Sequence, residues 1–214
     1  PDAQATGTAL GRIERVFARR RLPVCFQWLD AFATGLAGQL SAAAYLEMER
    51  LPLLVCTQEQ VVVPSTELLE LVTVGSDSPL EDVAENWNIN ARGFDPEATL
   101  ATPGDVESFR SSLTGSRAFT ARLNGAGVSA GMYTDIHDGV TELVGIATLA
   151  EYRRRGFGGA LTAYAAQCAF ANGAEVVFLS AASAEASRVY QRVGFGPVGE
   201  LVMMTKKLWD QNQL

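Results

Sequence analysis

The chain has 214 residues, of which 48% are hydrophobic and 19% are charged, and its formal net charge is −7. This length can bury one full core with an appendage, or two smaller cores. The acidic balance argues against a nucleic-acid partner and against an anionic membrane, because both select a basic face. No apolar run approaches the roughly 20 residues of a membrane span, and the N-terminus lacks the features of a signal peptide. We therefore expect a soluble, cytoplasmic protein.

Residues 1–60 are predicted to form one unit with the element order αβαβ. Its elements are a helix ending near Arg21, a strand at 24–28, a helix from the N-cap Asp30 to about Leu40, and a strand at 46–56. The same order is predicted near the C-terminus, as a helix at 157–171, a strand at 175–180, a helix at 184–193 and a strand at 200–207. A shift of 150 residues pairs Trp28 with Phe178 and Leu40 with Tyr190. We interpret the first unit as a degenerate half repeat without chemistry of its own; a chance similarity is the alternative.

Residues 61–214 are predicted to form a second domain, with the order β-α-α-β-β-β-α-β-α-β from Leu68 onward. Its first elements are a strand at 68–74, helices at 79–93 and 103–113, and strands at 117–123 and 128–134. The turn at 124–127 makes the last two strands a hairpin.

The stretch from Glu142 to Ala160 carries the strongest functional signal. An apolar strand leads into three arginines, then into a glycine-rich turn, and a helix follows at once. The first turn of a helix has backbone N–H groups without partners, and the helix dipole adds positive potential there. Glycines let those N–H groups approach an anion, and arginines add charge-assisted hydrogen bonds to phosphate oxygens. The stretch therefore predicts a phosphate-binding loop.

The spacing of this loop excludes two common phosphate-binding motifs. No Gly-Lys-Ser/Thr follows, as a P-loop would need, and Leu161 stands where a dinucleotide-binding loop would have its third glycine. The pattern Arg153-x-x-Gly156-x-Gly158 instead resembles the acetyl-CoA pyrophosphate loop of the GCN5-related N-acetyltransferase (GNAT) family. The segment Ser183 to Phe195 closely resembles a second motif of that family. The resemblance covers about residues 67–207.

The resemblance implies an α/β (α+β) fold with a mixed, mostly antiparallel sheet that is flanked by helices and splayed at the cofactor site. It implies acetyl-CoA as cosubstrate and no metal. The pantetheine arm of acetyl-CoA would bond to Ile146, Ala147 and Thr148. The loop residues assigned to the cofactor are Arg153, Arg154, Arg155, Gly156, Phe157, Gly158 and Gly159, with the pyrophosphate held from Arg154 onward. Ser183 stands where the family commonly has asparagine, so its shorter reach puts that contact in doubt.

Two residues are candidates for proton transfer. Tyr190 occupies the family's position for the general acid; the alternative is an aromatic residue packed in the core. Glu142 lies 11 residues before Arg153, the spacing of the strand glutamate that histone-acetylating members use as a base. A carboxylate among apolar neighbours can have a raised pKa and accept a proton from an ammonium. The alternative for Glu142 is an exposed charge at the start of the strand.

Three weaker signals are set aside. Residues 127–131 match the Gly-x-Ser-x-Gly pattern of serine hydrolases, but the strand pattern continues through them instead of turning into a helix. Asp135, His137 and Asp138 could suggest a metal site, although a polar hairpin tip is the commoner origin of such a cluster. The three cysteines, Cys25, Cys56 and Cys168, are odd in number and lie in apolar contexts, which predicts reduced core thiols.

The predicted function is transfer of an acetyl group from acetyl-CoA to a primary amine of a small molecule, or of a peptide, by direct attack. The alternative is a non-catalytic acyl-CoA-binding sensor or interaction module. The acceptor pocket is expected between the helices at 79–93 and 103–113 and the sheet, with Glu85, Trp87 and Phe109 as its polar and aromatic residues. A homodimer is compatible with the sequence, and no nucleic-acid or membrane partner is expected.

Overall fold

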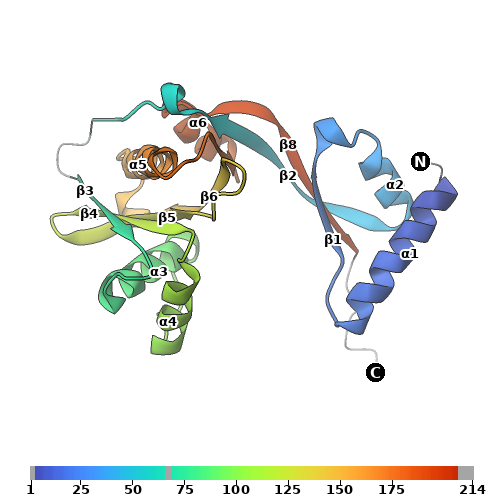
Figure 1. Ribbon diagram of the computed structural model, residues 1–214, viewed down its shortest axis with the longest axis horizontal. Helices are drawn as coiled ribbons and strands as arrows, with labels where there is room; N and C mark the ends of the chain where they lie inside the picture. Colours follow the sequence, from blue (N-terminus) through green and yellow to red (C-terminus); the bar gives the residue numbers. More distant parts are fainter. Residues whose placement is uncertain (1–2, 66–68, 207–214) are drawn as a thin grey trace. The chain divides into compact units, whose positions relative to one another are not determined.

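The computed structural model describes residues 3–65 and 69–206 (Figure 1). Its internal contacts divide the chain into an N-terminal unit, residues 1–53 with 198–214, and a larger unit, residues 54–197. The predicted boundary at residue 60 lies a few residues beyond this division. The chain from Val198 onward, which the sequence placed with the larger domain, belongs by its contacts to the N-terminal unit.

The N-terminal unit packs two helices on three neighbouring strands. Its elements are α1 (Ala3–Arg19), β1 (Cys25–Leu29), a 3-10 turn (Asp30–Phe32), α2 (Leu36–Ala42), most of β2 (Tyr45–Cys56) and most of β8 (Gly196–Lys206). The strand order is β1-β8-β2. β8 pairs with β1 in a register that sets Phe26 opposite Met204 and Trp28 opposite Val202. The core of this unit is formed by Leu10, Val24, Leu40, Tyr45, Val202 and Met204.

Two expectations for this unit were wrong. Asp30 does not cap the second helix: α2 begins at Leu36, after Gly35 with a φ of +88°. Asp30 instead forms an ion pair with Arg50 of β2, at 3.1 Å between Oδ2 and Nη1. Cys25 is exposed rather than a core thiol, because the alternation of β1 turns Phe26 and Trp28 toward the core.

The larger unit contains five neighbouring strands of the sheet, and helices cover both faces of these strands (Figure 1). Its elements are a 3-10 turn (Gln58–Gln60), β3 (Leu69–Val74), α3 (Leu80–Phe94), α4 (Pro103–Ser112), β4 (Arg117–Leu123), β5 (Ala126–Tyr133), β6 (Val140–Thr148), a 3-10 turn (Ala150–Tyr152), α5 (Phe157–Ala171), β7 (Val176–Ser180) and α6 (Ala184–Arg192). The strand order is β7-β6-β5-β4-β3. β3, β4, β5 and β6 pair antiparallel, whereas β6 and β7 are parallel. The mixed, mostly antiparallel sheet is confirmed.

The helix α5 lies at the centre of this unit. It is apolar on nearly every side, as expected for a helix inside a large core, and its buried residues include Leu161 and Phe170. It packs on one face of the sheet, and α3 and α4 lie on the other (Figure 1). No helix within residues 3–65 and 69–206 is both long and apolar enough to cross a membrane.

The sheet opens between β6 and β7. The two strands pair only from Val140 to Glu142, opposite Val176 to Phe178. β6 then continues to Thr148 along β5, while β7 ends at Ser180. The splay that the resemblance implied therefore begins directly after Glu142.

Candidate active site

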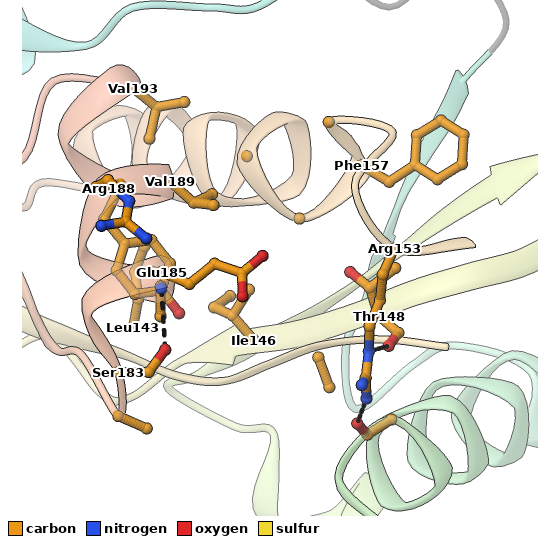
Figure 2. A pocket seen from close by; sticks show the side chains of 18 of the residues that line it. Leu143, Ile146, Thr148, Arg153, Phe157, Ser183, Glu185, Arg188, Val189 and Val193 are labelled. Atoms are coloured by element: carbon orange, nitrogen blue, oxygen red, sulfur yellow. Dashed lines mark hydrogen bonds between the residues drawn. The ribbon is translucent and has the colours of Figure 1, made fainter. Parts of the chain in front are cut away.

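A cavity of about 970 Å³ occupies this opening, and all of its lining residues belong to the larger unit (Figure 2). Its walls are the edge of β6, the end of β7, the loop before α5, the first turn of α5 and one face of α6. All the predicted site residues except Arg155 line it: Glu142, Ile146, Ala147, Thr148, Arg153, Arg154, Gly156, Phe157, Gly158, Gly159, Ser183 and Tyr190. Segments far apart in the sequence thus meet at one place.

The edge of β6 along the cavity is shaped by a β-bulge. Ala130 of β5 faces Ala147, yet Met132 faces Val144, so β6 has one extra residue in this interval. The bulge lies at Gly145, whose φ of +64° favours glycine. The Asn90 side chain of α3 donates a hydrogen bond to the carbonyl of Gly145. This contact holds the bulge from the face of the sheet that α3 covers.

The loop before α5 and the first turn of the helix line the cavity with backbone that is suited to an anion. Arg154 and Gly156 have φ values of +60° and +86°, and the helix begins at Phe157 with no side-chain cap. The first helical hydrogen bond runs from Ala160 N to Gly156 O (3.0 Å). The N–H groups of the preceding helical residues therefore have no partner within the helix, and they lie at the positive end of its dipole. This arrangement suits a pyrophosphate, because Gly158 puts no side chain in front of them.

The three consecutive arginines have different surroundings. Arg153 donates from Nη2 to the carbonyl of Gly93 (2.7 Å) and from Nε to the carbonyl of Thr148 (3.1 Å), as Figure 2 shows. Arg155 does not line the cavity; its guanidinium lies over the rings of Phe157 and Tyr152, at 5.0 and 5.8 Å from their centroids. Arg154 is exposed and lines the cavity, as Arg153 does, but within residues 3–65 and 69–206 its side chain makes no hydrogen bond or ion pair. Arg154 is therefore the arginine best placed for a phosphate.

Tyr190 combines the two interpretations that the sequence left open. Only 9% of the residue is exposed, and its ring packs against Phe195 at 6.5 Å between centroids. It is also part of the cavity wall. Burial raises the pKa of its hydroxyl, so the group keeps its proton at neutral pH. A protonated hydroxyl at the wall of the opening is suited to donate that proton.

Ser183 is the N-cap of α6 and lines the cavity. Its Oγ accepts a hydrogen bond from Ala186 N at 3.1 Å (Figure 2). The hydroxyl can still donate its own proton. Capping accounts for a serine here independently of any cofactor.

Glu142 is half-buried rather than an exposed charge. It is the last β6 residue paired with β7, and it lines the cavity. Its neighbour Leu143 belongs to the core around α5, so strand alternation places Glu142 on the face toward α3. Desolvation raises the pKa of its carboxyl group. A carboxylate with a raised pKa is a stronger base toward an ammonium group.

The residues predicted for the acceptor pocket do not line this cavity. Glu85 is bound within the fold: its Oε2 accepts from Arg122 Nε (2.8 Å) and its Oε1 from Gly127 N (3.1 Å). Trp87 and Phe109 pack edge to face on each other, at 5.1 Å between centroids. These three side chains stabilise α3 and α4 against each other and the hairpin.

Sequence reasoning missed several lining residues. Gly93 and Phe94, at the end of α3, face the edge of β6, and Glu185, Arg188 and Arg192 line the cavity from α6. The α6 residues recur at helical spacing on one face, a signal that the sequence carried. The end of α3 could not be placed from sequence, because it meets β6 only through the tertiary fold.

The rejected motifs have structural explanations. Ser129 of the Gly-x-Ser-x-Gly pattern is buried in β5 and donates a hydrogen bond to the carbonyl of Ala147 (2.6 Å). Asp135, His137 and Asp138 are exposed near the turn before β6. Within the described ranges, no three His, Cys, Asp or Glu residues gather as a metal site requires.

Comparison with known proteins agrees with this geometry. Residues 82–195, more than half of the chain, match the sequence model of the Acetyltransferase (GNAT) family. A solved GCN5-related N-acetyltransferase from Kribbella flavida is similar, with a TM-score of 0.79 and 28% identity over 96% of this chain and 76% of that chain.

Two further solved structures share the fold. A GCN5-related N-acetyltransferase from Sphaerobacter thermophilus has a TM-score of 0.72 and 18% identity, covering 99% of this chain and 70% of that one. A tandem GNAT protein from the clavulanic acid biosynthesis pathway has a TM-score of 0.69 and 15% identity, covering 96% and 71%. No curated protein matches the sequence significantly.

Proposed function

Because the chain belongs to the GNAT family of acetyltransferases, we propose that it transfers an acetyl group from acetyl-CoA to a primary amine of a small molecule or a peptide. One observation carries this proposal: the gap between β6 and β7 opens into a cavity that is bordered by the uncapped first turn of α5 and by Tyr190. A helix end suited to a phosphate and a hydroxyl suited to donate a proton thus line one cavity.

The residues present fit the cosubstrate. Gly158 has little room for a side chain, since a Cβ there would lie 3.3 Å from Thr148 Oγ1, and the backbone N–H groups beside it point to an anion site. Arg154 would add charge to that site. The edge of β6 at Ile146, Ala147 and Thr148 borders the cavity where β7 no longer pairs with it, so its backbone groups can bond to an extended pantetheine arm.

The chain would supply positioning and proton transfer. Acetyl-CoA provides a thioester carbonyl carbon, to which an amine nitrogen bonds as the carbon–sulfur bond breaks. Glu142 would accept a proton from the ammonium form of the acceptor, directly or through water. Tyr190 would donate its proton to the departing sulfur. The presence of Tyr190 in the cavity wall favours this activity over a non-catalytic acyl-CoA sensor.

The test is a panel of primary amines incubated with acetyl-CoA while released thiol is measured. We expect thiol release that depends on both the protein and an amine, and mass spectrometry should find the acetylated amine. Acetyl-CoA binding by calorimetry without amine-dependent thiol release, across a broad panel, would support the sensor instead. Absence of acetyl-CoA binding would contradict both.

A further inference from the structure

The last turn of α3 is in direct contact with the edge of β6 that borders the cavity. Asn90 donates to the carbonyl of Gly145 at the bulge. One turn later, Gly93 lies so close to β6 that a Cβ added to it would be 2.7 Å from the Cβ of Ala147. Only glycine permits this approach, because any larger residue would push the helix away from the strand. The position of the β6 edge is therefore coupled to the position of α3.

Arg153 completes this contact. The carbonyl of Gly93 is among the last of α3 and has no partner within the helix, and it accepts from Arg153 Nη2 at 2.7 Å. A guanidinium at this end of the helix is also favoured by the helix dipole. The same side chain donates from Nε to the carbonyl of Thr148, the last residue of β6, at 3.1 Å. One arginine thus ties the end of a helix to the end of a strand.

These contacts bracket the residues assigned to the pantetheine arm. Asn90 holds β6 at Gly145, and Arg153 holds it at Thr148; Ile146 and Ala147 lie between the two points. Figure 2 shows the Arg153 side chain beside Thr148, and the guanidinium also donates to the carbonyl of Gly93. Both arginines are exposed and line the cavity. Two donors of Arg153 are used within the protein, whereas the side chain of Arg154 makes no hydrogen bond or ion pair to the residues that the structure describes.

We propose that Arg153 is a positioning residue which fixes the β6 edge for the pantetheine arm, and that Arg154 is the arginine which binds the pyrophosphate. This inference rests on the proposed function, since it assigns two residues of the loop to two parts of the same cosubstrate: Arg153 to the pantetheine arm and Arg154 to the pyrophosphate. It predicts that the two neighbouring arginines can be told apart by a ligand that has the pantetheine arm but no phosphates.

The experiment compares acetyl-CoA with acetyl-pantetheine as ligands of the parent protein and of R153Q, R153K and R154Q, with affinities from NMR titration. Replacing Arg153 should weaken both ligands by about tenfold, the usual consequence of losing hydrogen bonds from a charged donor. R153K should not restore binding, because an ammonium cannot reproduce the forked contact to two carbonyls. R154Q should weaken acetyl-CoA by a similar factor and leave acetyl-pantetheine unchanged.

A second measurement needs no ligand. Hydrogen exchange in the free protein should be faster at the end of α3 and the end of β6 in R153Q and R153K, and unchanged there in R154Q. L40A in the N-terminal unit serves as the control for general destabilisation, and it should leave the affinity for acetyl-pantetheine unaltered.

The inference is overturned if R153Q weakens acetyl-CoA alone and R153K restores it, since Arg153 would then be a phosphate ligand. It is equally overturned if R153Q leaves both affinities and the local exchange unchanged. Failure of the parent protein to bind acetyl-CoA is a different result, and it contradicts the proposed function.

Discussion

Two segments of this chain have the same order of elements and different surroundings. Subtracting 150 from the bounds of α5, β7, α6 and β8 gives 7–21, 26–30, 34–42 and 46–56, compared with 3–19, 25–29, 36–42 and 45–56 for α1, β1, α2 and β2. This agreement supports the predicted half repeat, which remains a prediction. The cavity described above is lined by residues of the second segment and by none of the first.

The difference lies in a few positions. Gly158 at the first turn of α5 corresponds to Thr8, and Tyr190 of α6 corresponds to Leu40, which is fully buried. The second segment is also preceded by β6, which separates from β7 after Glu142, and by the loop in which Arg154 and Gly156 have positive φ. The order αβαβ thus supplies a scaffold, whereas the proposed chemistry depends on the splayed strand, the glycine loop and the Tyr190 hydroxyl.

The largest expected effect is that of Gly158→Glu on acetyl-CoA binding. A carboxylate about 4 Å from the pyrophosphate repels it by roughly 4 kcal/mol near a protein surface, or about a thousandfold in affinity. The same substitution at Gly7 of α1, where an added Cβ meets nothing within 4 Å, should leave binding intact. Calorimetry on both folded variants tests the difference, and near-normal affinity of the Gly158 variant would remove the loop assignment.

The second-largest effect is expected for Tyr190→Phe, on kcat. It keeps the ring and its packing but removes the proton donor, so kcat should fall about 10²–10⁴-fold while acetyl-CoA affinity changes little. The matched control is Tyr45→Phe in the N-terminal unit, whose hydroxyl donates to Glu14 Oε1 at 2.9 Å. That variant should lose about 1 kcal/mol of stability and keep its kcat. Equal kcat values for Tyr190→Phe and the parent would show that Tyr190 packs in the core and does not act as the proton donor.

Leu40→Ala tests the proposal that the N-terminal unit has no catalytic role. Leu40 is fully buried, so its truncation should lower the free energy of unfolding by about 2–5 kcal/mol. The kinetics of the folded fraction should not change, because the cavity is lined by residues of the larger unit. Chemical denaturation and steady-state kinetics measure the two effects. A lower kcat at a temperature where the variant remains folded would contradict the assignment.

The smallest effect is the change in Tm expected for Glu142→Gln, and its size depends on pH. Burial raises the pKa of Glu142 in the folded chain, so its contribution to stability is present below the ordinary glutamate pKa of about 4.3 and is lost as the pH rises through the folded pKa. The variant should therefore have a higher Tm than the parent at pH 8, with a gain that shrinks toward pH 4.

Glu47→Gln in the N-terminal unit is a control for which the opposite pH dependence of stability is expected. A hydrogen bond from Arg50 lowers the pKa of Glu47, so its contribution is present above the ordinary pKa and is lost as the pH falls. Glu47→Gln should not stabilise the protein at pH 8.

For Glu142→Gln, activity should fall most near neutral pH and recover at higher pH, where more of the amine is already neutral. A loss that is uniform with pH would assign Glu142 to acceptor binding.

Much of the fold could be predicted from the sequence because its signals are local. The αβαβ order, the hairpin at Asn124 and Gly125, and the helix after the glycine loop follow from hydrophobic periodicity and turn residues that act within a few positions. The wrong assignment of Asp30 shows the limit of such signals. An aspartate before an apolar stretch is a good N-cap candidate, yet Arg50, 20 residues away, offered a stronger charged partner.

For the candidate site too, some features could be predicted from the sequence and others depend on the tertiary structure. The sequence by itself indicated that the loop and α6 contribute to one site, since the spacing of Arg153, Gly156, Gly158 and Tyr190 is a property of the linear chain, and all four residues line the cavity. Only the tertiary structure decided how they differ: Arg153 bonds to the end of α3, Arg155 packs over two rings, and Glu142 loses water at the last paired position of β6. These outcomes depend on neighbours brought in from distant positions, and a hydrogen bond or a desolvated charge exists only once those neighbours are in place.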